Sequence, residues 1–179
     1  MEATYRVLTA DPPWLFGDKL PGKTRGASKQ YRCLTVAEIK AWQLPPLEAD
    51  AILFLWRVAA MQEEALSVVR AWGFVPKAEM VWEKLTKTGK PWMGMGHYVR
   101  ASHETAIIAT RGRFHVRDRS IRSRFSARVP VDDNGRYIHS AKPEDFRELV
   151  EAMSAGPYVE LFGRKWREGW TVLGDEVGE

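Results

Sequence analysis

The stretch of residues 50–56 constrains the fold of this chain more than any other. Six apolar residues stand in succession there, between Asp50 and Arg57. A strand with one face in water alternates apolar and polar residues, whereas an unbroken apolar run of this length is typical of a strand buried on both faces. Such strands occur mostly in parallel sheets that helices cover on both sides. The run therefore predicts a central strand of a layered α/β sheet.

The rest of the chain alternates between strand patterns and helix patterns. Further strands are expected over residues 5–10, 78–82, 105–109, 158–162 and 170–173, and helices over residues 35–43, 59–72 and 142–154. Thr35 and Glu38 have the spacing of a capping box, and Gly73 follows the second helix where a C′ glycine belongs. This order predicts a mostly parallel sheet with helices on both faces, in a single domain of residues 1–179.

Length and composition are those of a globular domain. The 179 residues are 45% hydrophobic and 28% charged, which is ordinary for one folded unit. No apolar run reaches transmembrane length and the first residues lack a signal-peptide pattern, so no membrane association is expected. Because Cys33 is the single cysteine, no internal disulfide can form, which predicts a reducing, cytoplasmic compartment. The four histidines show no metal-site spacing, so no metal is expected.

A second feature follows the first predicted strand directly: the tetrapeptide Asp11-Pro12-Pro13-Trp14, called here the proline turn. Two consecutive prolines fix φ and carry no N–H, so this segment cannot continue a sheet ladder. It offers an Asp carboxylate and two free proline carbonyls, all acceptors, beside a flat aromatic ring. These groups suit an exocyclic amino group on a planar base: the acceptors bind its N–H protons and the ring stacks. The alternative is a turn that merely ends a strand, with Trp14 in the core.

Basic residues concentrate in two segments, although the net charge is only +4. Between residues 111 and 128 seven arginines accompany one acid, and a second basic stretch lies within residues 15–34. Neither has apolar periodicity, so loops are expected over about residues 15–34 and 111–137. A solvated charge run is the ordinary interpretation of either, but two such loops beside an amino-group site favour a nucleic acid. The arginines expected to bind its phosphates are Arg111, Arg113, Arg117, Arg119, Arg122 and Arg124.

Several functional side chains directly follow predicted strands. In open α/β sheets, ligands bind beyond the carboxyl ends of the strands. The residues in that position are Asp11, Lys84, Phe162 with Gly163 and Arg164, and Asp175. They are therefore expected to converge on one edge of the sheet.

The motifs and their order resemble the MT-A-seventy family of N6-adenine methyltransferases. The resemblance covers nearly the whole chain and rests on the proline turn, on Tyr31, and on residues 52–56, 81–84, 140–144, 160–164 and 174–176. It implies a Rossmann-like methyltransferase fold in permuted order, with the catalytic motif before the cofactor motif. It also implies methyl transfer from S-adenosylmethionine to the N6 amino group of adenine in nucleic acid, leaving S-adenosylhomocysteine.

The resemblance also implies roles for single residues. The proline turn, Asp11, Pro12, Pro13 and Trp14, would bind the adenine amino group and stack on the base. Tyr31 would lie on a loop that closes over the base. The cofactor would be held by Lys84, Glu160, Phe162, Gly163, Arg164, Asp175 and Glu176. Of these, Lys84 would face the methionine carboxylate and the Asp175-Glu176 pair would hold the ribose hydroxyls.

Other interpretations stay open. An amide-N methyltransferase acting on protein glutamine would solve the same amino-group problem, although its motif typically begins with Asn. A catalytically inactive, nucleic-acid-binding partner subunit of the same family is an alternative of a different class, and the intact proline turn together with Lys84 argues against it. DNA is favoured over RNA because the chain is compact and shows no RNA-binding extension. A homodimer or a heteromeric partner is compatible with the sequence.

Overall fold

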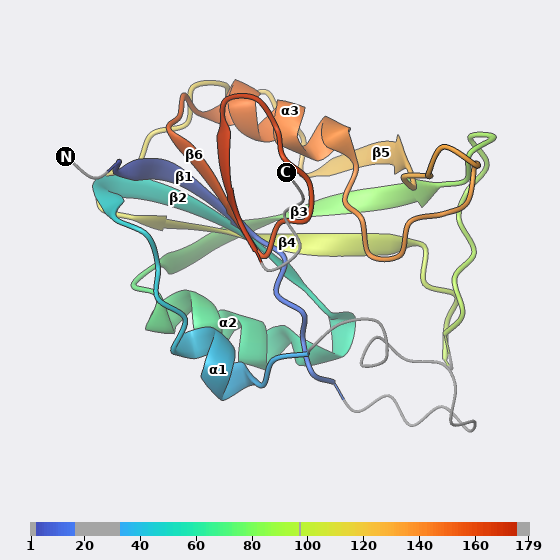
Figure 1. Ribbon diagram of the computed structural model, residues 1–179, viewed down its shortest axis with the longest axis horizontal. Helices are drawn as coiled ribbons and strands as arrows, with labels where there is room; N and C mark the ends of the chain where they lie inside the picture. The colour runs from blue at the N-terminus through green and yellow to red at the C-terminus, as the bar shows by residue number, and fades with distance from the viewer. Residues whose placement is uncertain (1–2, 17–32, 97, 175–179) are drawn as a thin grey trace.

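The computed structural model describes residues 3–16, 33–96 and 98–174, which form one seven-stranded sheet with helices packed on it (Figure 1). The strands are β1 (Tyr5–Ala10), β2 (Leu47–Arg57), β3 (Val75–Leu85), β4 (His103–Arg111), β5 (Arg124–Arg128), β6 (Tyr158–Leu161) and β7 (Trp170–Leu173). The helices are α1 (Val36–Lys40), α2 (Gln62–Ala71), which follows the 3-10 helix η2 (Ala59–Met61), and α3 (Glu144–Met153). This architecture confirms the predicted α/β methyltransferase-like fold.

Strand direction decides which residues meet at the edge of the sheet where β1 ends. The order across the sheet is β5-β3-β4-β2-β1-β6-β7. The pairs β1–β2, β1–β6, β6–β7 and β3–β5 are parallel, whereas β4 runs antiparallel to both β2 and β3. The connection from β3 to β4 contains no helix in its described residues, and a parallel crossover needs one. As a result, the first residues of β4 lie at the edge where β1, β2 and β3 end.

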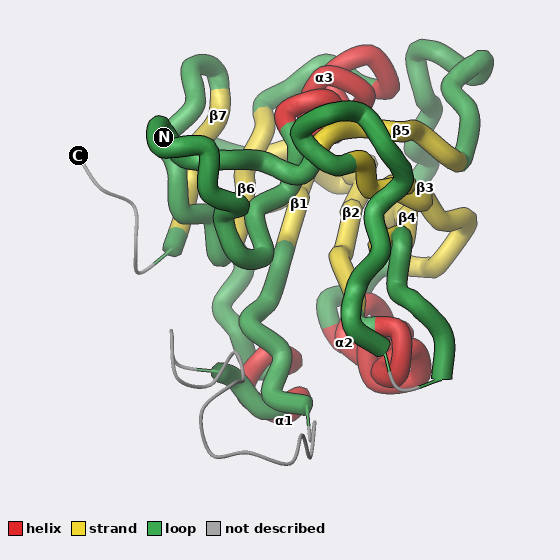
Figure 2. The backbone as a smooth tube through the Cα atoms, turned by 90° about the vertical axis from the view of Figure 1, so that its right-hand side faces the viewer, coloured by secondary structure: helices red, strands yellow, loops and turns green. Residues whose placement is uncertain are grey.

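Helices cover both faces of the sheet, as predicted. Helices α1 and α2 lie on one face and α3 on the other (Figures 1 and 2). In β2, Leu53 and Leu55 pack in the core cluster under α1 and α2, whereas Ile52 and Phe54 pack in the cluster under α3. All four side chains are fully buried, and each such burial stabilises the fold by about 1.5–3 kcal/mol. Burial on both faces explains why the run in β2 has no polar alternation.

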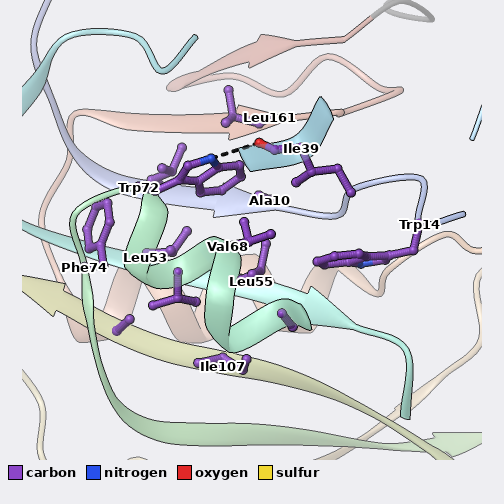
Figure 3. Packing of buried hydrophobic residues seen from close by; sticks show 14 of the residues in the cluster. Ala10, Trp14, Ile39, Leu53, Leu55, Val68, Trp72, Phe74, Ile107 and Leu161 are labelled. Atoms are coloured by element: carbon purple, nitrogen blue, oxygen red, sulfur yellow. Dashed lines mark hydrogen bonds between the residues drawn. The ribbon is translucent and has the colours of Figure 1, made fainter. Parts of the chain in front are cut away.

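The α1–α2 layer is joined by specific caps and contacts. Thr35 and Glu38 form the predicted capping box, in which the Thr35 backbone N donates to Glu38 Oε2 at 2.8 Å. The indole Nε1 of Trp72, at the end of α2, donates to the carbonyl of Ile39 in α1 at 3.0 Å (Figure 3). Gly73 has φ +80° and ends α2 as predicted. No helix in the described part of the chain is long and apolar enough to cross a membrane.

One predicted loop contains a strand. Residues 124–128, within the arginine-rich segment, form β5 on the edge of the sheet and pair with β3. The prediction of an uninterrupted loop over residues 111–137 was therefore wrong. The strand signal is short: only Phe125 and Ala127 alternate as inward-facing residues, and Ala127 is 4% exposed. Its carbonyl accepts a hydrogen bond from the indole of Trp82 at 2.9 Å, which fixes the position of β5.

Candidate active site

A cavity of about 450 Å³ opens at the carboxyl edge of β1. Its walls include the whole proline turn, the Lys84 side chain from the end of β3, and Arg164 from the turn that follows β6. Parallel strands deliver their last residues to one edge of a sheet, and the cavity lies at that edge. The structure therefore brings Asp11, Lys84 and Arg164 together as the sequence predicted, although Lys84 is the penultimate residue of β3 rather than a residue after it.

The proline turn is held by its own backbone. The carbonyl of Pro12 accepts from the Trp14 N–H and the carbonyl of Pro13 accepts from the Leu34 N–H, both at 2.8 Å. The expectation that both carbonyls are free was therefore wrong. A carbonyl oxygen has two lone pairs, so each keeps capacity for a second donor. The Asp11 carboxylate is the charged acceptor that the turn contributes to the cavity wall.

Trp14 is mainly a core residue. It is 5% exposed and belongs to the cluster under α1 and α2 (Figure 3). Its indole Nε1 donates to the carbonyl of Trp56 at 3.0 Å, which ties the turn to the end of β2. Trp14 borders the cavity as well. Stacking of this ring on a substrate base stays a prediction, whereas its anchoring of the turn is observed.

Four largely buried charges of alternating sign line the cavity, and they are called here the charge cluster: Asp11, Lys142, Glu104 and Lys84. The Lys142 ammonium lies 2.6 Å from Asp11 Oδ2 and 3.2 Å from Glu104 Oε2. The other oxygen of Glu104 pairs with the Lys84 ammonium. Lys142 enters from the segment before α3, and Glu104 from the antiparallel strand β4. Each carboxylate therefore lies beside at least one cation.

Burial and pairing set the protonation of the cluster. Burial raises the pKa of the Asp11 carboxyl above its ordinary value, and the Lys142 ammonium beside it offsets this only in part. Burial alone would also raise the pKa of Glu104, but Lys142 and Lys84 together lower it. Burial disfavours the charged form of Lys142, yet Asp11 and Glu104 outweigh that effect and raise its pKa. The ammonium of Lys142 is thus the fixed cation around which the two carboxylates are arranged.

Two buried tryptophan rings lie close to the ammonium groups of the charge cluster. The Lys142 ammonium lies 5.2 Å from the ring centroid of Trp56, and that of Lys84 lies 5.1 Å from the ring centroid of Trp82. These distances are within the range of cation–π contacts. Trp56 and Trp82 are 3% and 1% exposed, which agrees with their assignment to the core. They also restrict how the two lysines can move.

The predicted cofactor residues near β6 separate into two groups. Arg164 lines the cavity, and its Nη1 donates to the carbonyl of His139 at 3.4 Å. Glu160, Phe162 and Gly163 do not line it. Instead, Arg147 of α3 binds both carboxylate oxygens of Glu160, the closest contact being 2.6 Å, and the Phe162 ring lies 4.6 Å from that of Trp42.

Gly163 is a glycine for a packing reason. A Cβ at this position would overlap Val172 of β7, and the next nearest atoms belong to the Glu160 side chain. The Gly163 N–H donates to the carbonyl of Leu173 at 3.3 Å, so the turn lies directly against β7. The cofactor roles of Glu160, Phe162 and Gly163 stay predictions, and their observed contacts are structural. Tyr31, Asp175 and Glu176 lie outside the described residues.

None of the six predicted phosphate-binding arginines lines the cavity. Strand register explains the position of the first of them: Arg111 pairs with Ala51, six residues before the end of β2, whereas the cavity lies at that end, beside Arg57. Arg113 continues at that far edge, where its backbone N donates to Asp50 Oδ1 at 2.7 Å. Arg124 begins β5 and lies 4.0 Å from Glu83. A role in binding phosphate stays a prediction for all six.

Sequence reasoning missed two members of the charge cluster, Glu104 and Lys142. Lys142 stands in a segment that supports the family resemblance, directly before Pro143, and that position was the available signal. Glu104 carried no comparable signal, because its place depends on β4 running antiparallel. Two histidines, His103 and His139, also line the cavity. The described residues contain no group of three or more His, Cys, Asp or Glu side chains placed to hold a metal ion.

Comparison with known proteins gives one consistent result. A family model described as MT-A70 matches residues 5–176. The Homo sapiens N(6)-adenosine-methyltransferase catalytic subunit METTL3 is 25% identical over 182 residues, covering 97% of this chain and 28% of METTL3. The Drosophila melanogaster N(6)-adenosine-methyltransferase MT-A70-like protein is also 25% identical, covering 97% of this chain and 27% of that protein. The Type II methyltransferase M.MunI of Mycoplasma sp is 26% identical, covering 97% of this chain and 78% of M.MunI. The chain thus spans little more than a quarter of the two adenosine methyltransferases.

Proposed function

The chain belongs to the MT-A70 family, and we propose that it is an enzyme that methylates the N6 amino group of adenine in nucleic acid with S-adenosylmethionine. The observation that carries this proposal is the position of the Asp11 carboxylate. It lies in the cavity wall at the end of β1, held on one oxygen by Lys142. Lys142 donates to Oδ2 of this carboxylate, and we assign the other oxygen, Oδ1, as the acceptor for the amino group.

The cavity suits the proposed cofactor. Its volume of about 450 Å³ lies within the range of about 300–1,000 Å³ that small-molecule sites occupy. Lys84 and Arg164 bring two cationic groups to its wall, and a cation is what the cofactor's carboxylate requires. Lys84 also has Glu104 as a partner, so its charge is held in place before any ligand binds. When bound, S-adenosylmethionine supplies an electrophilic methyl group and leaves as S-adenosylhomocysteine.

Asp11 would act by positioning and electrostatics. Its carboxylate accepts an N–H of the adenine amino group, which turns the nitrogen lone pair out of conjugation with the ring. A preorganised acceptor of this kind lowers the barrier without a covalent enzyme intermediate. The nitrogen would bond to the methyl group as the bond from that carbon to sulfur breaks, and the proton that the nitrogen then loses would pass to the Asp11 carboxylate or to solvent water. Asp11, whose ionised form the Lys142 ammonium favours against the effect of burial, is the acceptor on that N–H.

The substrate class follows from charge. The described arginines of residues 111–128 offer phosphate contacts at a distance from the cavity, while the base would enter the cavity itself. We favour DNA over RNA on the compactness of the described domain, and the assay below includes both. A homodimer or a heteromeric partner would add contacts that loops rich in arginine do not supply, since such loops rarely read successive base edges. A reducing, cytoplasmic compartment agrees with the single cysteine, Cys33.

One experiment tests the proposal directly. The purified chain is incubated with S-adenosylmethionine and separate pools of DNA and RNA, and digested nucleosides are analysed by mass spectrometry. N6-methyladenine in either pool supports the proposal and identifies the nucleic acid. An Asp11→Asn variant, which keeps the shape of the side chain but removes its charge, is the control for contaminating activity. Absence of N6-methyladenine from both pools, with a folded protein, contradicts it.

A second candidate function is an inactive partner subunit of the same family. It predicts nucleic-acid binding without cofactor binding, and calorimetry with S-adenosylmethionine separates the two. The contact between Asp11 and Lys142 favours the enzyme, because a binding module has no need of a buried carboxylate in its cavity wall. A glutamine amide methyltransferase would use the same acceptor, and a glutamine-containing peptide added to the assay tests that alternative.

A further inference from the structure

Ser140 has a backbone conformation that its residue type disfavours. Its φ is +59°, one of two positive φ values at non-glycine residues in the described chain. It is the third residue of a turn closed by the Ala141 N–H and the Ile138 carbonyl at 3.4 Å. Glycine and asparagine are the residues favoured at a turn position with positive φ. A serine keeps this conformation only where the surrounding structure imposes it.

The consequence of this conformation is the direction of one carbonyl. The Ser140 oxygen points to the Lys142 ammonium and accepts a hydrogen bond from it at 3.1 Å. Asp11 Oδ2 at 2.6 Å and Glu104 Oε2 at 3.2 Å are the other two oxygens around this nitrogen. A lysine ammonium has three N–H donors, so these three acceptors use all of them. The Trp56 ring centroid lies 5.2 Å from the same nitrogen, so a cation–π contact adds to the three hydrogen bonds.

We propose that Ser140 is a positioning residue for the methyl transfer: its left-handed backbone directs its carbonyl to Lys142, and Lys142 in turn fixes the rotamer of Asp11. With one Asp11 oxygen tied to the ammonium, the other is held toward the cavity. Without the Ser140 carbonyl, one N–H of Lys142 lacks an acceptor and the ammonium rotates away from Asp11. This inference rests on the proposed function for its catalytic consequence, and on geometry alone for the contact.

The carbonyl, not the hydroxyl, carries this role. The Ser140 hydroxyl lies 2.8 Å from Nδ1 of His139, whereas the Ser140 carbonyl is the atom that accepts from Lys142. A substitution that keeps positive φ should therefore keep the hydrogen bond from Lys142 to the carbonyl of residue 140, even though the hydroxyl is lost. Asparagine tolerates the left-handed region, whereas valine, which is similar in size and branched at Cβ, does not. Ser140→Asn and Ser140→Val thus form a pair that separates backbone conformation from side-chain volume.

The kinetic test compares kcat and cofactor affinity in these variants. Ser140→Val should have a kcat at least about tenfold below that of Ser140→Asn, because a displaced acceptor no longer orients the reacting nitrogen. The dissociation constant for S-adenosylmethionine should differ between the two by less than about threefold, as expected for a residue that acts only in the transition state. Ser67→Val, at a half-buried serine of α2, controls for the substitution itself. If Ser140→Val does not fold, Ser140→Ala replaces it, since alanine also disfavours positive φ.

A second measurement does not depend on activity. With ¹⁵N-labelled lysine, an ammonium that donates to three acceptors exchanges its protons slowly enough to give a signal. The Lys142 signal, assigned by its loss in Lys142→Gln, should be present in Ser140→Asn and broadened or lost in Ser140→Val. The backbone amide signals of the labelled lysines are the internal reference, because they report the fold independently of the Lys142 ammonium.

The two measurements separate the two proposals. A wild-type chain without methyltransferase activity contradicts the proposed function, while the Lys142 signal still decides whether Ser140 positions the ammonium. A Ser140→Val chain that is folded and keeps the Lys142 signal of the wild type overturns the inference. Equal losses of kcat in Ser140→Asn and Ser140→Val overturn it as well, because a volume effect would then explain both.

Discussion

Two charged regions of this molecule are built in opposite ways. In the charge cluster, Asp11, Lys142, Glu104 and Lys84 alternate in sign, and their side chains are only 11–28% exposed. In the arginine-rich segment of residues 111–128, seven arginines share one sign, and most of them are exposed. The cluster forms part of the cavity wall at the carboxyl edge of β1, while the segment begins at the opposite edge of the sheet.

The difference lies in what each region holds in place. In the cluster, the charged groups themselves are fixed by one another. In the segment, the backbone is fixed: Asp50 accepts from the Arg113 N–H, and the Met153 carbonyl accepts from the Arg117 N–H, both at 2.7 Å. Breaking a buried pair costs about 3–5 kcal/mol, whereas an exposed pair is worth about 0–1 kcal/mol. The cluster can therefore orient a reacting group, and the segment can attract a polyanion over distance.

The largest expected effect is at Asp11. Replacement of Asp11 by Ala should lower kcat by about 10²–10³, because one preorganised group aimed at the reacting nitrogen is removed. Cofactor affinity should change only a few-fold, since the carboxylate serves the amino group. Steady-state kinetics and calorimetry measure the two quantities, with Asp145→Ala in the exposed first turn of α3 as control. A variant that retains more than a third of the wild-type kcat would show that Asp11 is not catalytic.

The next effect concerns the cationic wall of the cavity. Lys84→Ala and Arg164→Ala should each weaken S-adenosylmethionine binding by about 1.5–3 kcal/mol if each removes a charge-assisted hydrogen bond. Arg147→Ala provides the comparison within the same region, because Arg147 pairs with Glu160 outside the cavity. It should reduce stability more than affinity. A structure with bound cofactor that places Lys84 and Arg164 far from it would contradict this assignment.

The sequence predicts local features of this molecule better than contacts between distant segments, and the reason is physical. The bounds of β1 and β7, the capping box and the glycine after α2 all follow from local patterns, and they were predicted correctly. Asp11 and Lys84 were found because each lies at or near the end of a predicted strand. Lys142 contacts Asp11 across 131 positions, so no local pattern contains that pairing.

Glu104 and β5 show what else local patterns lack. Glu104 reaches the cluster because β4 is antiparallel, and direction depends on the connection rather than on the strand's own residues. The strand β5 adds only Phe125 and Ala127 to the core, fewer residues than a period-2 signal needs among so many arginines. Glu160 is a further case: its motif predicts a ligand contact, which stays a prediction, and no local pattern contains its observed pair with Arg147.

The pH dependence of the reaction tests whether the charge cluster sets the pKa of Asp11. The Asp11 carboxylate must be ionised to accept an N–H, so activity is present above its pKa and is lost as the pH falls through it. Burial raises this pKa, which places the acid limb of kcat above the ordinary pKa of aspartate. Lys142 lowers the pKa of Asp11 and Glu104 raises it. Lys142→Gln should therefore move the acid limb to higher pH, and Glu104→Gln should move it to lower pH.

Opposite shifts of the acid limb in these two variants would identify an electrostatic effect of the cluster on Asp11. Loss of stability alone would move both acid limbs in the same direction, because a weakened fold unfolds sooner on the acid side. The measurement is kcat against pH for the wild type and both variants, with thermal unfolding at each pH as control. Shifts in the same direction would mean that the cluster does not tune Asp11.

The smallest effect is expected in the arginine-rich segment, where each charge acts separately. Replacement of Arg117, Arg119 and Arg122 by Ser should lower the slope of log K against log salt for duplex DNA by about 0.9 for each phosphate that the segment no longer binds. The effect on kcat at saturating substrate should be small, because none of these residues lines the cavity. The matched control removes three exposed cations elsewhere, Lys40, Arg70 and Lys77, and so lowers the net charge equally. If both triple variants change the slope by the same amount, the segment supplies only net charge. If neither changes it, the arginines are a solvated run, and any contact with phosphate belongs to another part of the chain.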